Sequence, residues 1–134
     1  MITVVVGPPC AGKSTFVREN AKPNDAVVDF DSLATAFGSG AAHDTPQPLR
    51  RVVQAARRAA VSQILLGVVE TAWVIDTDPG HFMLQQYRRA GATIEVIDPG
   101  MEVCIERALA DERPEWTADQ IRRWYRLNKK ATRA

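Results

Sequence analysis

The sequence has few cysteines, almost no net charge and no long apolar run, and each shortage argues against a class of protein. Only Cys10 and Cys104 occur among 134 residues, which does not fit a disulfide-stabilised scaffold, so we expect free thiols in a reducing compartment. The formal net charge of +1 gives no sign of a strongly acidic or basic partner. No apolar run approaches the roughly 20 residues of a membrane span. These shortages favour a cytoplasmic protein without a membrane partner.

What remains is the composition of an ordinary globular domain. Hydrophobic residues make up 46% of the chain and charged residues 25%, both close to the averages of soluble proteins. The length fits a single domain, and neither an internal repeat nor a linker divides the chain. The first residues carry neither the basic segment nor the cleavage site of a signal peptide, so we expect none. The sequence therefore predicts one domain over residues 1–134.

Short runs rich in β-branched residues alternate with segments of helical periodicity. The runs predict strands at residues 2–6, 26–29, 72–76 and 93–97. Strands separated by helices predict a parallel sheet of about four or five strands covered on both faces, a three-layer α/β/α fold. Helices are expected over residues 13 to about 20, from Thr45 and Pro46 to about 66, from Asp78 and Pro79 to 90, from 103 to about 111 and after Thr117, with a helical turn over 32–37.

Residues 7–14 match the phosphate-binding pattern G-x-x-x-x-G-K-S, between a predicted strand and a predicted helix. Glycines permit the turn, loop amides and the helix N-terminus hold phosphate oxygens, Lys13 reaches the β- and γ-phosphates, and Ser14 binds Mg²⁺. The pattern predicts a P-loop NTPase fold that binds ATP, with GTP possible, together with Mg²⁺. The predicted nucleotide site consists of Gly7, Pro8, Pro9, Cys10, Ala11, Gly12, Lys13, Ser14 and Thr15.

Several carboxylates follow predicted strands, at the sheet edge where such folds bind ligands. Asp76 ends an apolar strand and is a candidate Mg²⁺ ligand, with a cap at the strand end as the alternative. Asp31 is a candidate general base for an acceptor hydroxyl, with an N-cap of the turn at Ser32 as the alternative. Asp29 is a weaker candidate on the substrate side, and Asp98 also lies at a strand end.

Together, four segments resemble the 5′-kinase domain of phage-type polynucleotide kinases, within the P-loop kinase superfamily: residues 7–15, 29–31, 74–77 and 94–125. The resemblance implies that Asp31 is the acceptor-side aspartate. It also implies that Arg107 or Arg113 acts from a lid over the phosphates, where a guanidinium stabilises the transferring phosphoryl group. We prefer Arg113, which precedes Pro114 and so is expected at a helix end. Pairing of these arginines with acidic neighbours is the alternative.

Two segments are locally basic. Arg50, Arg51, Arg57 and Arg58 form one stripe of a predicted helix, and residues 121–134 contain six Lys or Arg and no acid. Either segment can contact a nucleic acid backbone or simply form a solvated face. We assign Arg50 and Arg57 to substrate binding. His43 and His81 have no second His or Cys at metal-ligand spacing, so we assign no zinc site.

The sequence thus predicts an ATP- and Mg²⁺-dependent kinase that transfers the γ-phosphate to a hydroxyl, first of all the 5′-hydroxyl of single-stranded DNA or RNA. The predicted catalytic residues are Lys13, Asp31, Arg113 and Arg107. No basic residue adjoins Asp31, where polynucleotide kinases of this type carry some, so two alternatives stay open. One is a kinase of nucleosides, nucleotides or small molecules; the other is a P-loop ATPase or nucleotide-binding protein without an external acceptor.

Overall fold

The computed structural model describes residues 1–41 and 43–132 and has an α/β fold. Its four strands form one parallel sheet in the order β2-β3-β1-β4. The described strands are β1 (Ile2–Val6), β2 (Ala26–Val28), β3 (Ala72–Asp76) and β4 (Thr93–Val96). The described helices are α1 (Lys13–Asn20), α2 (Phe30–Ala36), α3 (Gln47–Leu65), α4 (His81–Arg89), α5 (Met101–Ala110) and α6 (Trp116–Thr132).

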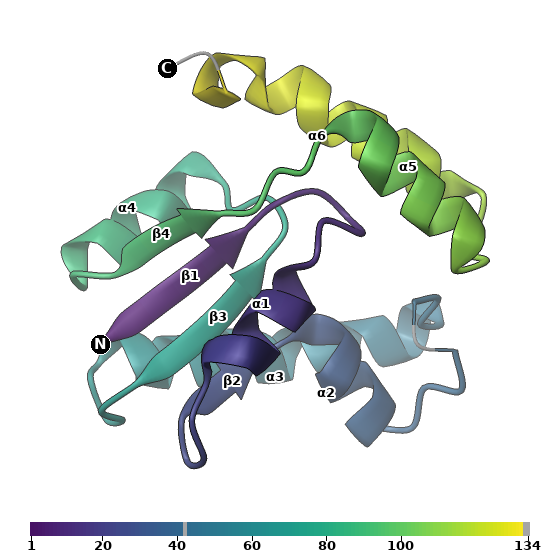
Figure 1. The fold of residues 1–134 in the computed structure, drawn as a ribbon. Coiled ribbons are helices and arrows are strands. Elements are labelled where there is room, and N and C mark those ends of the chain that lie inside the picture. Colours follow the sequence, from purple (N-terminus) through teal and green to yellow (C-terminus); the bar gives the residue numbers. More distant parts are fainter. Residues whose placement is uncertain (42, 133–134) are drawn as a thin grey trace.

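The two faces of the sheet are covered by different helices. Side chains of the central strand β1 alternate, so Val4 and Val6 face one side and Val5 faces the other. The first side packs against α3, α4 and α6, including Tyr87 and Trp124, whereas the second packs against α1. The α/β class, the parallel sheet and the helices on both faces agree with the sequence-based prediction, and Figure 1 shows this arrangement.

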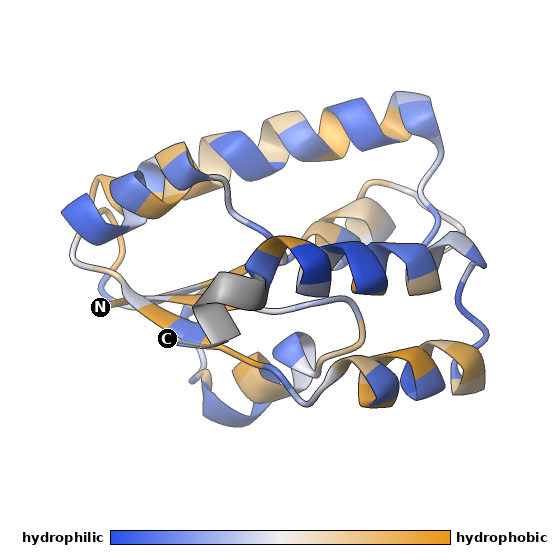
Figure 2. Cartoon of the chain, turned by 90° about the horizontal axis from the view of Figure 1, so that it is seen from above, coloured by the Kyte–Doolittle hydropathy of each residue, from blue (hydrophilic) through white to orange (hydrophobic). Residues whose placement is uncertain are grey.

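The long helices are amphipathic, as expected of helices with one side on the sheet. Figure 2 shows hydrophilic and hydrophobic residues alternating along them. In α3 the buried residues are Val53, Val61 and Ile64, all on the inner side. Among the described residues, none of the helices is both long enough and apolar enough to cross a membrane.

Several helix starts differ from the prediction by two or three residues. Strand β2 ends at Val28, and Asp29 occupies the N-cap position of α2, so the alternative role of Asp31 as an N-cap is wrong. Asp31 lies instead in the first turn of that helix. Helix α5 begins two residues earlier than expected, after Gly100, which has a φ of 107°. Neither start has a side-chain cap hydrogen bond, and helix boundaries without one are difficult to locate from residue type.

The helices predicted to begin at a threonine or a proline also start at other residues than predicted. Helix α3 starts after Pro46, not after Thr45, and Thr45 is buried. Helix α4 starts after Gly80 and not at Asp78. Thr117 lies inside α6 and does not cap it. Threonine is a frequent N-cap, but a buried threonine can also be placed by packing, which sequence pattern does not register.

The strand register brings the predicted site residues to one edge of the sheet. Val6 pairs with Asp76, so Asp76 lies directly beside the start of the loop that follows β1. Val28 pairs with Val74, which places the residues after β2 next to the end of β3. Because all the strands are parallel, their carboxyl ends meet at this edge. In Figure 1, α5 and α6 lie side by side beyond the ends of β1 and β4, close to this edge.

Candidate phosphate-binding site

A cleft of about 1760 Å³ lies at the carboxyl edge of the sheet. This volume exceeds the roughly 300–1,000 Å³ of a typical single-ligand pocket, so the cleft has room for two ligands. Its walls come from the loop after β1, from α2 and α3, and from the connection between α5 and α6. The predicted residues that line it are Pro9, Cys10, Ala11, Gly12, Lys13, Ser14, Thr15, Asp29, Asp31, Arg50, Arg57, Asp76, Arg107 and Arg113.

The loop between β1 and α1 has a backbone that only certain residues permit. A Cβ atom at Gly7 would lie 2.4 Å from the carbonyl oxygen of Ile97, so no larger residue fits there without a shift. Gly12 has a φ of 100°, in the left-handed region that glycine adopts most easily. Cys10 also has a positive φ, of 64°. The loop is therefore held in a tight conformation, and the first turn of α1 has no side-chain cap and no acidic residue.

Lys13 is buried beneath this loop. Its Nζ donates hydrogen bonds to the carbonyl oxygens of Gly7 at 2.8 Å and Pro8 at 2.7 Å. Burial lowers the pKa of Lys13 to about 8, an effect that Asp29 and Asp31 oppose from across the cleft. The ammonium group thus sits inside the loop that the sequence predicts to hold phosphates.

The two lid candidates have different roles in the structure. Nη1 of Arg107 donates to the carbonyl oxygens of Cys10 at 3.3 Å and Ala11 at 3.2 Å, so α5 braces the loop. Nε of Arg113 lies 2.5 Å from Oδ2 of Asp111, which is the pairing with an acidic neighbour that the sequence left open. This contact is the main cause that lowers the pKa of Asp111. Both arginines nevertheless line the cleft.

Asp76 has two partners on one of its oxygens. The hydroxyl of the fully buried Tyr87 donates to Oδ2 at 3.0 Å, and Nη2 of Arg57 lies 3.4 Å from the same atom. Burial and the neighbouring carboxylate raise the pKa of Tyr87 to about 12, so the hydroxyl remains a donor. Both contacts use Oδ2, and Oδ1 is the oxygen that remains for a metal ion or its water.

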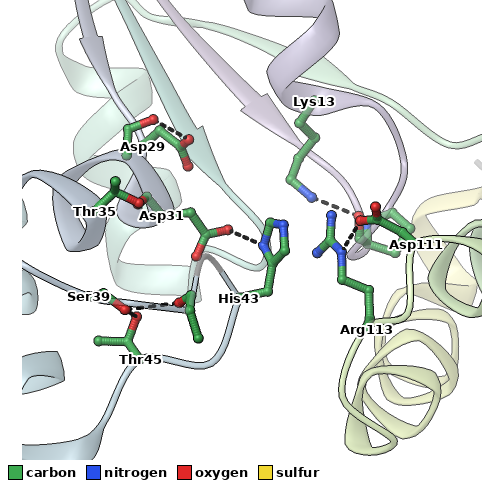
Figure 3. Close-up of polar contacts among 12 residues, drawn as sticks. Lys13, Asp29, Asp31, Thr35, Ser39, His43, Thr45, Asp111 and Arg113 are labelled. Atoms are coloured by element: carbon green, nitrogen blue, oxygen red, sulfur yellow. Dashed lines mark hydrogen bonds and ion pairs between the residues drawn. The ribbon is translucent and has the colours of Figure 1, made fainter.

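The carboxylates of Asp29 and Asp31, which the sequence predicts on the acceptor side, are also paired. Oδ2 of Asp29 accepts a hydrogen bond from the hydroxyl of Ser32 at 2.9 Å. Oδ2 of Asp31 lies 3.1 Å from Nδ1 of His43, in the loop between α2 and α3. Figure 3 shows Asp31 and His43 on one side of the cleft and Lys13, Asp111 and Arg113 on the other. No role was predicted for His43, because it has no second His or Cys at metal-ligand spacing and its partner Asp31 is not close in the chain.

Arg50 is less satisfied than its neighbours on α3. It lines the cleft, and its Nε is the only buried side-chain nitrogen or oxygen without a hydrogen-bond partner among the described residues. A buried donor without a partner is destabilising, so a hydrogen-bond acceptor that reached this nitrogen would be bound favourably. Asp98, by contrast, does not line the cleft and accepts hydrogen bonds from Gly100 and Tyr125.

The sequence did not predict the contacts of Asp76 with its two partners. Tyr87 belongs to α4 and Arg57 to the helix before β3, and no local pattern connects them with the strand end. The amphipathic pattern of α3 could have indicated an inward position for Arg57, because Arg57 lies on the same face of the helix as the buried Val53 and Val61. Arg133 of the predicted basic tail lies outside the described residues.

Comparisons with known proteins found no family model and no curated protein that matches this chain. The resemblance to polynucleotide kinases therefore stays a prediction. In the described part of the chain, no three His, Cys, Asp or Glu side chains gather as a metal site. A magnesium ion held by Ser14, Asp76 and nucleotide phosphates would not require such a group.

Proposed function

We propose that this chain is a P-loop kinase that transfers the γ-phosphate of ATP to a hydroxyl, with a polynucleotide 5′-hydroxyl as the first acceptor to test. The observation that carries the proposal is that Lys13 and Asp31 face one another across a single cleft. Lys13 belongs to a loop suited to phosphates, and Asp31 belongs to the opposite wall. A phosphoryl donor and a hydroxyl acceptor can then bind side by side, which a transferase requires.

On the donor side, the amides of residues 7–12 and the start of α1 hold the phosphates. Lys13 exchanges its two carbonyl contacts for oxygens of the β- and γ-phosphates. Mg²⁺, when bound with the nucleotide, neutralises charge on the phosphates, and the exposed Ser14 and Oδ1 of Asp76 are the groups that would hold it. The guanidinium of Arg113 leaves Asp111 and then closes on the transferring phosphoryl group.

On the acceptor side, Asp31 serves the hydroxyl, directly or through the histidine that it contacts. Arg50 supplies a cation whose Nε has no hydrogen-bond partner among the described residues. A polynucleotide offers both features that these groups suit, because its 5′-hydroxyl is followed by backbone phosphates. Neutral small alcohols would leave Arg50 unpaired, and this favours the polynucleotide over them.

The test is phosphate transfer from γ-labelled ATP with Mg²⁺ to a 5′-hydroxyl oligonucleotide. We expect label on this strand, none on a 5′-phosphorylated strand, and none with Lys13→Ala. We also expect Arg50→Ala to raise KM for the oligonucleotide about tenfold, whereas Arg51→Ala, an exposed neighbour outside the cleft, leaves it unchanged.

Three other results would contradict this assignment. Transfer to a nucleoside or small alcohol but not to the oligonucleotide would make the chain a kinase of small molecules. Release of inorganic phosphate at a rate that no hydroxyl compound changes would make it an ATPase without an external acceptor. Binding of ATP without either reaction would leave only the nucleotide site.

A further inference from the structure

His43 occupies a specific position between the two walls of the cleft. It lies in the loop between α2 and α3, and its Nδ1 is 3.1 Å from Oδ2 of Asp31. The side chains of His43 and Asp31 are 34% and 42% exposed, so both are accessible to a ligand in the cleft. Figure 3 shows the imidazole ring on the cleft side of Asp31, toward Lys13 and Arg113.

The opposite wall lies close enough to interact with His43. The charge of His43 contributes to the lowered pKa of Asp111, after the larger effects of Arg113. Asp31 in turn acts on Lys13 across the cleft. The imidazole is therefore surrounded by Asp31 on its own wall and by Lys13, Asp111 and Arg113 on the other.

The contact with Asp31 determines which ring nitrogen is free. A carboxylate only accepts hydrogen bonds, so Nδ1 of His43 must be the donor in this pair. In the neutral ring, Nε2 then carries a lone pair and no proton. No hydrogen bond to Nε2 of His43 occurs among the described residues, so this atom is available to accept a proton from a ligand.

We infer that His43, and not Asp31, takes the proton from the acceptor hydroxyl, while Asp31 orients the imidazole through Nδ1. This inference rests on the proposed kinase function and names a further catalytic residue for it. An imidazole is a stronger base than a carboxylate. Asp31 also has its Oδ2 engaged by His43, which reduces its capacity to bind the hydroxyl itself.

The proposed transfer conserves atoms and charge. The acceptor oxygen forms a bond to the γ-phosphorus as the bond from that phosphorus to the β,γ-bridging oxygen breaks. The hydroxyl proton moves to Nε2 of His43, the carboxylate of Asp31 compensates the imidazolium charge, and the bridging oxygen leaves on ADP. The imidazolium then releases its proton to water, which restores the starting state.

Two substitutions separate a catalytic role from a positioning role. His43→Asn keeps an amide donor about where Nδ1 lies, and so keeps the contact with Asp31, but it has no group equivalent to Nε2. His43→Ala removes both. His81→Asn is the matched control, because His81 lies on α4 outside the cleft and contacts Gln85.

The experiment measures steady-state transfer from ATP to the 5′-hydroxyl oligonucleotide for all three variants, with added imidazole in a second series. We expect His43→Asn and His43→Ala to lower kcat about a hundredfold, the lower end for general base catalysis, with KM changed less than about threefold. Added imidazole should restore part of kcat in His43→Ala but not change the wild-type protein. His81→Asn should match the wild type.

Each other outcome overturns the inference in a different way. Full activity of His43→Asn, with loss in His43→Ala, would mean that His43 only positions Asp31. Loss in both variants without rescue, accompanied by a higher KM or a lower melting temperature, would indicate a structural role. No transfer by the wild-type protein to the oligonucleotide or to a nucleoside would refute the kinase proposal itself, and this inference with it.

Discussion

Arg57 joins two positions at the end of the third strand: its Nη2 donates to the carbonyl oxygen of Ile75 at 3.0 Å and lies 3.4 Å from Oδ2 of Asp76. The side chains of Arg57 and Asp76 are only 20% and 17% exposed. A residue that we assigned to substrate binding from its place in a basic stripe thus has a structural partner. Arg57 holds the strand end where the candidate metal ligand is located.

Removal of Arg57 should destabilise the fold as well as affect the site. In Arg57→Ala, Asp76 remains partly buried without its cation, and the Ile75 carbonyl loses a donor. We expect the free energy of unfolding to fall by about 2 kcal/mol, below the roughly 3–5 kcal/mol found when fully buried pairs are broken. Urea unfolding measures this change. Arg58→Ala, at an exposed neighbouring position, should stay within about 0.5 kcal/mol of the wild type, and an equal effect of both substitutions would contradict the assignment.

Tyr87 and Arg57 should be energetically coupled, because both contact Oδ2 of Asp76. Tyr87→Phe removes one hydroxyl from a fully buried position, and we expect a loss of about 1.5–3 kcal/mol, as for hydrogen bonds to charged groups. The double variant with Arg57→Ala should depart from additivity by about 1 kcal/mol in a double-mutant cycle. Strict additivity would show that the two side chains do not share Asp76.

Gly7 should tolerate no side chain. In Gly7→Ala the added Cβ would lie 2.4 Å from the Ile97 carbonyl oxygen, and backbone on both sides leaves little freedom to move. We expect a loss of about 2–4 kcal/mol in the free energy of unfolding, together with weaker ATP binding. Gly40→Ala is the control, since a Cβ there meets no atom within 4 Å. Comparable stability of the two variants, measured by thermal unfolding, would mean that the loop can shift.

Asp25 should confer stability that depends on pH. Its Oδ2 accepts hydrogen bonds from the amide of Lys22 at 2.9 Å and from Nε1 of Trp73 at 3.0 Å. These bonds lower the pKa of Asp25 below its ordinary value of 3.8. The contribution of Asp25 to the free energy of unfolding is therefore fully present above pH 3.8. It is lost as the pH falls through the lower pKa of the folded state.

We therefore expect Asp25→Asn to be less stable than the wild type near neutral pH. The difference should shrink as the pH is lowered below 3.8. Thermal unfolding of both proteins across this range measures the change. Asp44→Asn is the control and should be about as stable as the wild type near neutral pH, because the exposed Asp44 carboxylate has no hydrogen-bond partner among the described residues. A constant gap between Asp25→Asn and the wild type would argue against the two hydrogen bonds.

The regular elements could be predicted because their signals are local. Each β-branched run, at β1 and at β3, and the G-x-x-x-x-G-K-S pattern consists of residues that are near neighbours in the chain, and propensity acts over that distance. Helix starts were less predictable, because Thr45, Asp78 and Thr117 are all suitable caps that tertiary packing did not use. Parallel order then followed from strands alternating with helices.

The alternating elements, the glycine-constrained loop around Lys13 and the carboxylates after the strands follow directly from the order of the amino acids. The pairing of side chains depends on the three-dimensional fold: His43 pairs with Asp31, Arg57 and Tyr87 with Asp76, and Arg107 with the loop. These partners are distant in the chain, and their meeting depends on how the helices pack over the sheet. Dihedral preferences act between neighbouring residues, whereas pairing depends on packing that the whole chain produces together.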